Sequence, residues 1–208
     1  MNAIRRRGAQ SGFTLIEILV STLLGSFFLA GLMSMATHQV SSARDQSTQI
    51  DLQQAVRNVA ELFGREVRRA GANPTCSADV KAIQFASHWM LRLHSDLDAN
   101  GSIQSQTEVI IYQHDPVTGT FRRIAGGEIE TLLDNVVWGQ VVISYFDANG
   151  VELPAEFYGL DSANRDKVRR VRFAIDIEQR TPNGEIVRAQ SSTDVTLRNR
   201  FFIQSAGC

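Results

Sequence analysis

The stretch Gly12-Phe13-Thr14-Leu15-Ile16-Glu17-Ile18-Leu19-Val20 decides the fold of the N-terminal part of this 208-residue chain. It opens a run over residues 13–36 that is almost continuously apolar and about long enough to span a bilayer as a helix. A secretory signal peptide has a shorter apolar run, followed by a small-residue cleavage site, and this sequence shows neither. The run therefore predicts a membrane-spanning helix that stays on the chain.

Glu17 is the only charged residue in this apolar run. An ionised side chain inside a membrane-spanning helix is costly unless it finds a partner, so its presence indicates a function. Three arginines at positions 5–7 precede the run, and Asp45 and Asp51 follow it. By the positive-inside rule, the N-terminus is expected in the cytoplasm, and the chain from about residue 37 in the periplasm or outside the cell.

The motif from Gly12 to Val20 resembles the type IV prepilin signature. The resemblance implies that a prepilin peptidase cleaves between Gly12 and Phe13 on the cytoplasmic side of the inner membrane and N-methylates the new amine of Phe13. In this family, the acidic residue that Glu17 matches pairs with the N-terminal amine of a neighbouring subunit. A carboxylate and an ammonium that are both buried can offset each other's desolvation. A plain signal anchor with an incidental glutamate is the alternative.

The helical pattern continues beyond residue 36 and becomes amphipathic. Apolar residues recur at steps of three and four, which predicts one buried stripe: Leu52, Val56, Val59, Phe63 and Val67. Gly71, followed by Asn73-Pro74, ends the predicted helix. The expected organisation is a leader peptide (1–12), a transmembrane or filament-core helix (13–36), the amphipathic half of the same helix (37–71) and a globular β-rich head (72–208).

Two further runs narrow the resemblance within the pilin-like proteins. The end of the helix, Phe63-Gly64-Arg65-Glu66-Val67-Arg68-Arg69-Ala70-Gly71, is similar to that of minor pilins of the W type and J-type pseudopilins of type II secretion. The closing run Val195-Thr196-Leu197-Arg198-Asn199 resembles the last strand of the same proteins.

The head shows strand patterns separated by turn signals, best seen in the alternation of apolar and polar residues over 171–178. The predicted strands cover residues 83–85, 89–93, 109–112, 120–124, 141–146, 171–178 and 186–197. The expected fold is α+β, with one antiparallel sheet packed by one face on the helix.

The loop Asp96-Leu97-Asp98-Ala99-Asn100-Gly101-Ser102-Ile103 matches the first eight positions of a calcium-binding loop. Side-chain oxygens of Asp96, Asp98 and Asn100 would converge on one cation, and Ser102 would offer its backbone carbonyl. Position twelve is Thr107 instead of glutamate, and Glu108, which follows one residue late, is the fifth candidate ligand. Similar loops occur in W-type pilins and pseudopilins. A turn that needs no ion is the alternative, because Asp, Asn and Gly favour turns in any case.

The remaining composition limits other functions. The two cysteines, Cys76 and Cys208, form no CxxC motif; outside the cytoplasm they could form a disulfide, and two unpaired thiols are the alternative. The net charge of −1 makes nucleic acid an unexpected partner. The scattered histidines match no catalytic motif, so no enzyme is expected.

The resemblance implies a structural role in filament assembly. The leading interpretation is a low-abundance minor pilin that primes assembly, sits at or near the tip of a pilus, and contacts other minor pilins and the major pilin. The alternatives are a J-type pseudopilin of type II secretion and, from a different class, an adhesin or ligand-binding module displayed on the filament.

Overall fold

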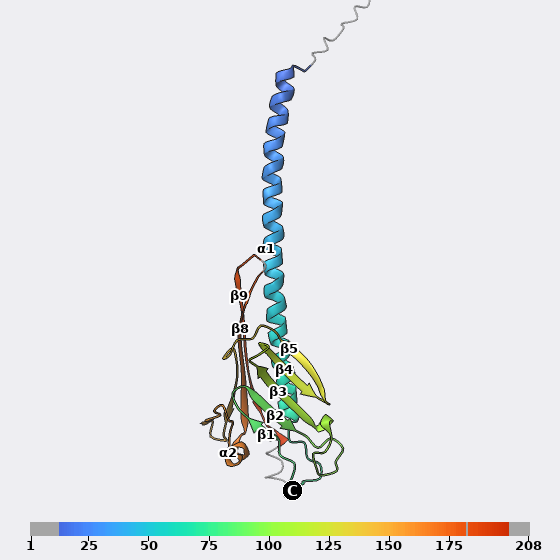
Figure 1. Ribbon diagram of the computed structural model, residues 1–208, viewed down its shortest axis with the longest axis vertical. Helices are drawn as coiled ribbons and strands as arrows, with labels where there is room; N and C mark the ends of the chain where they lie inside the picture. Colours follow the sequence, from blue (N-terminus) through green and yellow to red (C-terminus); the bar gives the residue numbers. More distant parts are fainter. Residues whose placement is uncertain (1–12, 182, 200–208) are drawn as a thin grey trace, which may run out of the picture. The chain divides into compact units, whose positions relative to one another are not determined.

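The computed structural model describes residues 13–181 and 183–199. It contains a long helix, α1 (Leu15–Arg69), followed by two antiparallel β-sheets (Figure 1). The predicted α+β class is therefore confirmed. By internal contacts the chain forms two compact units, divided between Gln46 and Ser47, and each is described by itself below.

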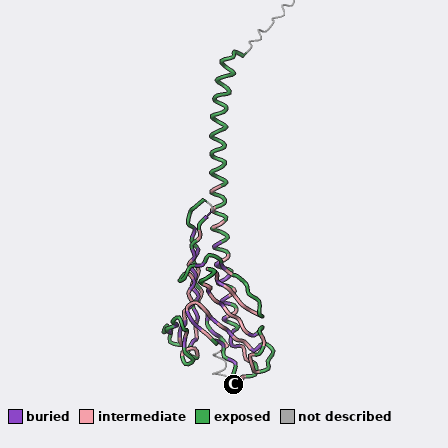
Figure 2. Tube along the Cα trace, viewed as in Figure 1, coloured by how far each residue is buried: buried purple, intermediate pink, exposed green. Residues whose placement is uncertain are grey.

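The N-terminal unit is the first part of α1, and it exposes its apolar side chains along its whole length (Figure 2). Among the described residues, α1 is the one helix long and apolar enough to cross a membrane. Its hydroxyl groups are satisfied locally, since Ser21 donates to the Glu17 carbonyl at 2.6 Å and Ser26 donates to the Leu23 carbonyl at 2.7 Å. Internal satisfaction of polar groups is what a hydrocarbon environment demands.

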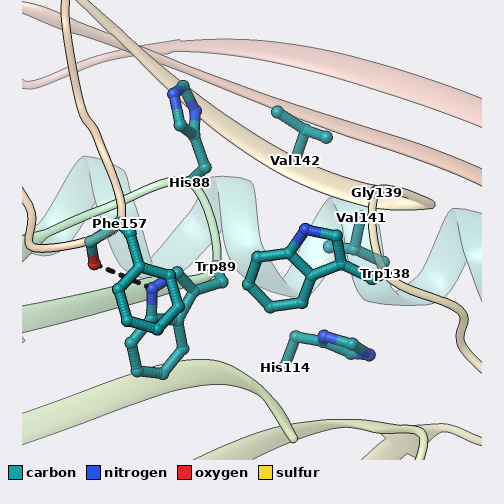
Figure 3. A pocket seen from close by; sticks show the side chains of 8 residues that line it. All are labelled: His88, Trp89, His114, Trp138, Gly139, Val141, Val142 and Phe157. Carbon is teal, nitrogen blue, oxygen red and sulfur yellow. Dashed lines mark hydrogen bonds between the residues drawn. The ribbon is translucent and has the colours of Figure 1, made fainter. Parts of the chain in front are cut away.

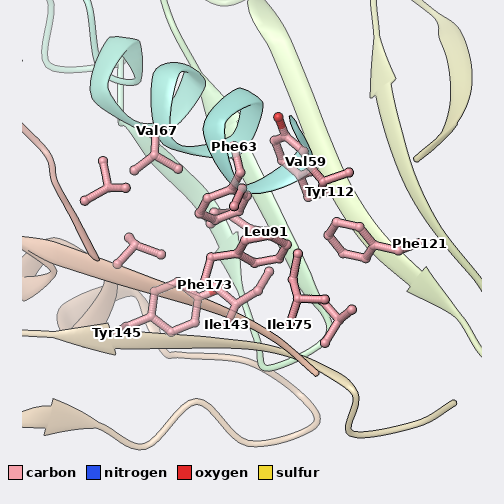
Figure 4. Packing of buried hydrophobic residues seen from close by; sticks show 14 of the residues in the cluster. Val59, Phe63, Val67, Leu91, Tyr112, Phe121, Ile143, Tyr145, Phe173 and Ile175 are labelled. Carbon is pink, nitrogen blue, oxygen red and sulfur yellow. The ribbon is translucent and has the colours of Figure 1, made fainter. Parts of the chain in front are cut away.

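In the second unit, the later turns of α1 bury one side. All five residues of the predicted stripe, from Leu52 to Val67, are buried. Phe63 lies at the centre of the core, where its ring stacks on Phe173 at 4.3 Å between centroids and meets the edge of Tyr112 at 5.0 Å (Figure 4). The predicted amphipathic half of the helix is thus confirmed.

The head contains two sheets, and the prediction of one sheet was wrong. The first sheet has the strand order β1-β2-β3-β4-β5: β1 (Ile83–Ala86), β2 (Met90–His94), β3 (Val109–Asp115), β4 (Thr120–Ala125) and β5 (Glu128–Leu133). The second has the order β7-β6-β8-β9: β6 (Val141–Phe146), β7 (Glu152–Leu153), β8 (Arg170–Arg180) and β9 (Ile186–Thr196). The ring centroids of Phe121 from the first sheet and Phe173 from the second lie 5.4 Å apart. Both sheets therefore share the core with α1.

Two short helical elements complete the head: a 3₁₀ turn at Gln106–Glu108 and α2 (Ser162–Lys167). All seven predicted strands are present with small shifts at their ends, whereas β5, β7 and α2 were not predicted.

The C-terminus of α1 is held by specific backbone partners. Gly71 has φ +75° and its N–H donates to the His94 carbonyl at 2.8 Å, which confirms the predicted helix end. The side chain of Asn199 donates to the carbonyls of Arg69 and Ala70, each at 3.1 Å. The Asn199 side chain, which follows β9, therefore satisfies carbonyls at the end of α1, and β2 supplies the acceptor for the Gly71 N–H.

Candidate functional site

The first turn of α1 carries the predicted assembly residues. Thr14 precedes the helix, and its hydroxyl accepts the Glu17 backbone N–H at 3.3 Å. Glu17 is exposed in this first turn, among the exposed side chains of Ile16 and Ile18. Phe13 is 80% exposed, whereas Gly12, on the other side of the predicted cleavage bond, lies outside the described residues. A carboxylate at a helix N-terminus is favoured by the helix dipole, and in lipid it would still require a cationic partner.

The acidic loop brings together three of the five predicted metal ligands. Carboxylate oxygens of Asp96, Asp98 and Glu108 lie within 4.8 Å of one another. Asp96 and Glu108 are buried, and Asp98 is exposed. An all-oxygen cluster with three negative charges has the chemistry that a hard cation such as calcium prefers.

Glu108, and not Thr107, reaches this cluster because of the short 3₁₀ turn at Gln106–Glu108. The turn forms a capping box: the Ser105 side chain accepts a backbone N–H of the turn, and the Glu108 carboxylate accepts the Ser105 N–H at 3.0 Å. These backbone donors lower the pKa of Glu108, with Ser105 contributing most. The carboxylate is thereby kept ionised and aimed at the loop.

The other two predicted ligands support the shape of the loop. Asn100 donates its backbone N–H to Asp96 at 3.2 Å and its side-chain amide to Asp98 at 2.8 Å. The Asn100 side-chain oxygen accepts both the N–H and the hydroxyl of Ser102, each at 2.8 Å. Gly101, with φ +80°, donates to Asp96 at 3.0 Å. The loop therefore adopts its turn through its own hydrogen bonds, and its carboxylates are held close together.

Glu66, from the arginine-rich run at the end of α1, connects the helix to the five-stranded sheet. Arg123 on β4 donates to its carboxylate through Nε at 3.0 Å and Nη2 at 2.6 Å, and the Tyr112 hydroxyl on β3 donates to it as well. Burial raises the pKa of Tyr112, and the Glu66 carboxylate raises it further. The hydrogen bonds to Glu66 also raise the pKa of Arg123. This group of three side chains has a structural role, which the sequence pattern alone did not reveal.

The structure describes one member of the predicted cysteine pair, Cys76. Cys76 lies in a turn after α1, with φ 59°. That turn is connected to the acidic loop by the Thr75 hydroxyl, which donates to Asp96 at 3.3 Å. Cys208 lies outside the described residues, so the pairing stays a prediction.

An aromatic pocket in the head was missed by the sequence analysis. It opens between the β1–β2 turn, the end of β3 and the loop before β6 (Figure 3). Its residues come from segments far apart in the chain, so no local spacing could reveal it. The lining is: His88, Trp89, His114, Trp138, Gly139, Val141, Val142 and Phe157.

The comparison with known proteins bears on the first turn of α1. The family model for the prokaryotic N-terminal methylation motif matches residues 7–33, the part of the chain that contains Phe13 and Glu17. The chain carries a prepilin methylation motif. No curated protein matches the chain.

The prepilin motif supports a type IV pilin or pseudopilin, consistent with the long helix and β-sheet head. It implies processing by a prepilin peptidase and assembly with other pilins, and together with the apolar helix it supports anchoring in the membrane. Proteins with this motif are typically structural components.

Proposed function

We propose that the chain is a minor type IV pilin of the W type, which primes assembly and sits at or near the tip of a pilus. The observation that carries the proposal is Glu17, a single carboxylate in the first turn of an exposed apolar helix, four residues after the predicted new N-terminus at Phe13. In a filament, the methylated amine of a neighbouring subunit would supply the cation that this carboxylate requires.

Features at both ends of the head favour a minor pilin over the major subunit. The chain does not have the two nearby C-terminal cysteines that form the usual loop of a major pilin. The runs that carry the resemblance to the W type lie where α1 joins the sheets. Glu66 accepts from Arg123 on β4, and Asn199 donates to the carbonyls of Arg69 and Ala70. The same features favour a J-type pseudopilin as the second candidate. In either case the head is expected in the periplasm before assembly.

Mass spectrometry of sheared, purified surface filaments and of the membrane fraction tests the proposal. The expected result is an N-methylated peptide that begins at Phe13, present in filaments far below the amount of the major pilin. A processed peptide confined to the envelope would instead assign the chain to a secretion pseudopilus. An unprocessed N-terminus in both fractions would contradict both candidates.

We also propose that Asp96, Asp98 and Glu108 hold a calcium ion, with Asn100 and Ser102 completing the loop. Support comes from the three clustered carboxylates, two of them buried. Calcium would offset the repulsion among these carboxylates and rigidify the loop. With free calcium at ten times the dissociation constant, binding adds about 1.4 kcal/mol and raises Tm by about 3–6 °C.

The calcium test is thermal unfolding of the full chain in detergent, with and without millimolar calcium. Replacing both Asp96 and Asp98 by alanine should abolish the increase in Tm. Asp147→Ala is the matched control, because Asp147 also forms an Asx-type turn, accepting the N–H groups of Asn149 and Val151 at 2.8 Å. An unchanged Tm in the wild-type chain would refute the calcium site.

Finally, we propose that Cys76 pairs with Cys208, which would tie the C-terminus to the turn after α1. The two cysteines are the only ones in the chain. Non-reducing peptide mapping of the envelope protein should recover one linked peptide that contains both. Alkylation of both cysteines without prior reduction would contradict the pairing.

A further inference from the structure

The aromatic pocket encloses about 330 Å³, which is within the size range of small-ligand sites. Trp89 stacks on Phe157 with ring centroids 5.6 Å apart, and Trp138 lies 6.3 Å from Phe157 and 5.5 Å from His114 (Figure 3). Trp138 and Phe157 are 53% and 59% exposed. Large apolar rings that cluster and yet remain exposed to water commonly mark a binding surface.

Polar ring atoms lie among these apolar faces. His88 Nδ1 donates to the Ile143 carbonyl at 3.2 Å, and His114 Nε2 donates to the Val136 carbonyl at 3.0 Å. The Trp89 indole N–H donates to the Phe157 carbonyl at 3.1 Å. Within the described residues, the second nitrogen of each histidine and the Trp138 indole N–H have no protein partner. His114 is buried, so its nitrogen could be reached only from inside the pocket.

The pocket has no charged side chain among its described lining residues. A charged ligand would lose its hydration there without gaining a counter-ion. A purely apolar ligand would cover the free nitrogens and leave them without hydrogen bonds, which is also costly. The ligand that suits both features is neutral, has an apolar face for the rings, and carries hydroxyl groups that can donate or accept.

We propose that this pocket binds a neutral hexose unit of a glycan. One C–H face of the sugar ring packs on Trp138 and Phe157, and its hydroxyls exchange hydrogen bonds with His88, His114 and the Trp138 N–H. Because His88 Nδ1 and His114 Nε2 face carbonyl oxygens, these nitrogens carry the proton, and the other nitrogen of each neutral imidazole accepts a hydrogen bond from a sugar hydroxyl. The proposal concerns the head alone and goes beyond its place in a pilus or a pseudopilus, so it can fail without affecting the proposed function.

Saturation-transfer NMR on the processed full chain, in a detergent without a sugar headgroup, tests the proposal. The probes are the methyl glycosides of glucose, galactose and N-acetylglucosamine, with glucuronate as a charged counterpart. We expect saturable binding of at least one neutral glycoside, strongest transfer to its C–H protons on one face, and none to glucuronate. Trp138→Leu and Phe157→Leu should each weaken binding about tenfold, since stacking on a ring contributes about 1 kcal/mol or more.

Tyr158→Ala is the matched control, because Tyr158 is an 88% exposed aromatic residue beside Phe157 that does not line the pocket. Its variant should bind like the wild type. Unchanged far-UV circular dichroism and an unchanged Tm must accompany the loss of binding in the leucine variants. Trp138→Phe, which keeps a ring, should recover part of the affinity. The proposal is overturned if no neutral glycoside binds, if the leucine variants bind normally, or if N-acetyl-phenylalaninamide occupies the pocket and the sugars do not.

Discussion

Glu66 attaches α1 to the five-stranded sheet through polar contacts with two of its strands. Its side chain is 10% exposed and accepts hydrogen bonds from both Arg123 and Tyr112. Glu66→Ala would leave a largely buried guanidinium and phenol without their acceptor. We expect the free energy of unfolding to fall by about 2–4 kcal/mol, measured by urea unfolding of the full chain in detergent.

The matched control for this prediction is Glu130→Ala. Glu130 contacts the same arginine at 3.3 Å but is 57% exposed, so its ion pair is screened by water. Its removal should change the free energy of unfolding by about 0.5 kcal/mol or less. Equal losses in the two variants would show that burial does not decide the strength of these pairs.

The two buried tyrosines, Tyr112 and Tyr145, predict that the protein loses stability at alkaline pH. Burial raises the pKa of both Tyr112 and Tyr145 above the ordinary value of 10.0. Above that pH the unfolded chain releases these two protons while the folded chain keeps them. The stabilisation is therefore complete below pH 10, and the free energy of unfolding falls by about 1.4 kcal/mol per pH unit for each tyrosine above it.

Tyr112→Phe should halve this dependence on pH, because Tyr145 alone then contributes. Urea unfolding at several pH values above 10 measures the slope. Tyr158→Phe is the control, since its side chain is 88% exposed and meets water in both states. A slope that Tyr112→Phe leaves unchanged would contradict the buried, protonated state of Tyr112.

At the scale of the element, the end of α1 is fixed by a glycine. Gly71 has φ +75°, and an added Cβ would lie 2.7 Å from the Ala82 Cβ. Gly71→Ala therefore combines backbone strain of about 1–2 kcal/mol with a steric clash in the core. We expect a total loss of about 3–4 kcal/mol in the free energy of unfolding.

Gly184→Ala separates the two effects. Gly184 has φ +87°, but nothing lies within 4 Å of an added Cβ. Its substitution should cost only the backbone strain, about 1–2 kcal/mol. If Gly71→Ala costs no more than Gly184→Ala, the close approach of α1 to Ala82 does not constrain the helix end.

The elements that could be predicted are those with a strong apolar pattern. The stripe on α1 and the alternation in β8 bury one face each, so their side chains reveal their periodicity. β5 is an edge strand that is exposed except near its end, and α2 buries no residue. These elements have little apolar pattern, although Gly126-Gly127, both with positive φ, forms the two-residue hairpin turn that introduces β5.

The candidate sites divide in the same way. The first turn of α1 and the acidic loop are continuous in sequence, so their residue types and spacing could be recognised directly. Glu108 was predicted as a ligand, but the 3₁₀ turn that brings its side chain to the loop was not. The aromatic pocket is lined by segments of both sheets. It therefore depends on how the two sheets lie together, which local sequence does not specify.

At the scale of the whole molecule, the two units have different demands on their surroundings. The first part of α1 exposes Phe, Leu and Ile side chains that require lipid or other helices. The second unit buries its apolar residues in one core, which the two sheets form together with the later turns of α1. The carboxylate of Glu17 opposes insertion into lipid, and under the proposed function its benefit would come when subunits meet.

This reasoning predicts opposite effects of one substitution on two steps. Glu17→Leu removes a charge from the apolar helix, so insertion in the membrane should be unimpaired or more favourable. Incorporation into filaments should fall at least tenfold, because the N-terminal amine of the neighbouring subunit loses its partner. The measurement is the ratio of processed protein in sheared filaments to that in membranes. Ser26→Leu is the control: among the described residues, the Ser26 hydroxyl donates only to the Leu23 carbonyl of the same helix, so incorporation should be normal. Wild-type incorporation of Glu17→Leu would mean that the charge serves a step before assembly.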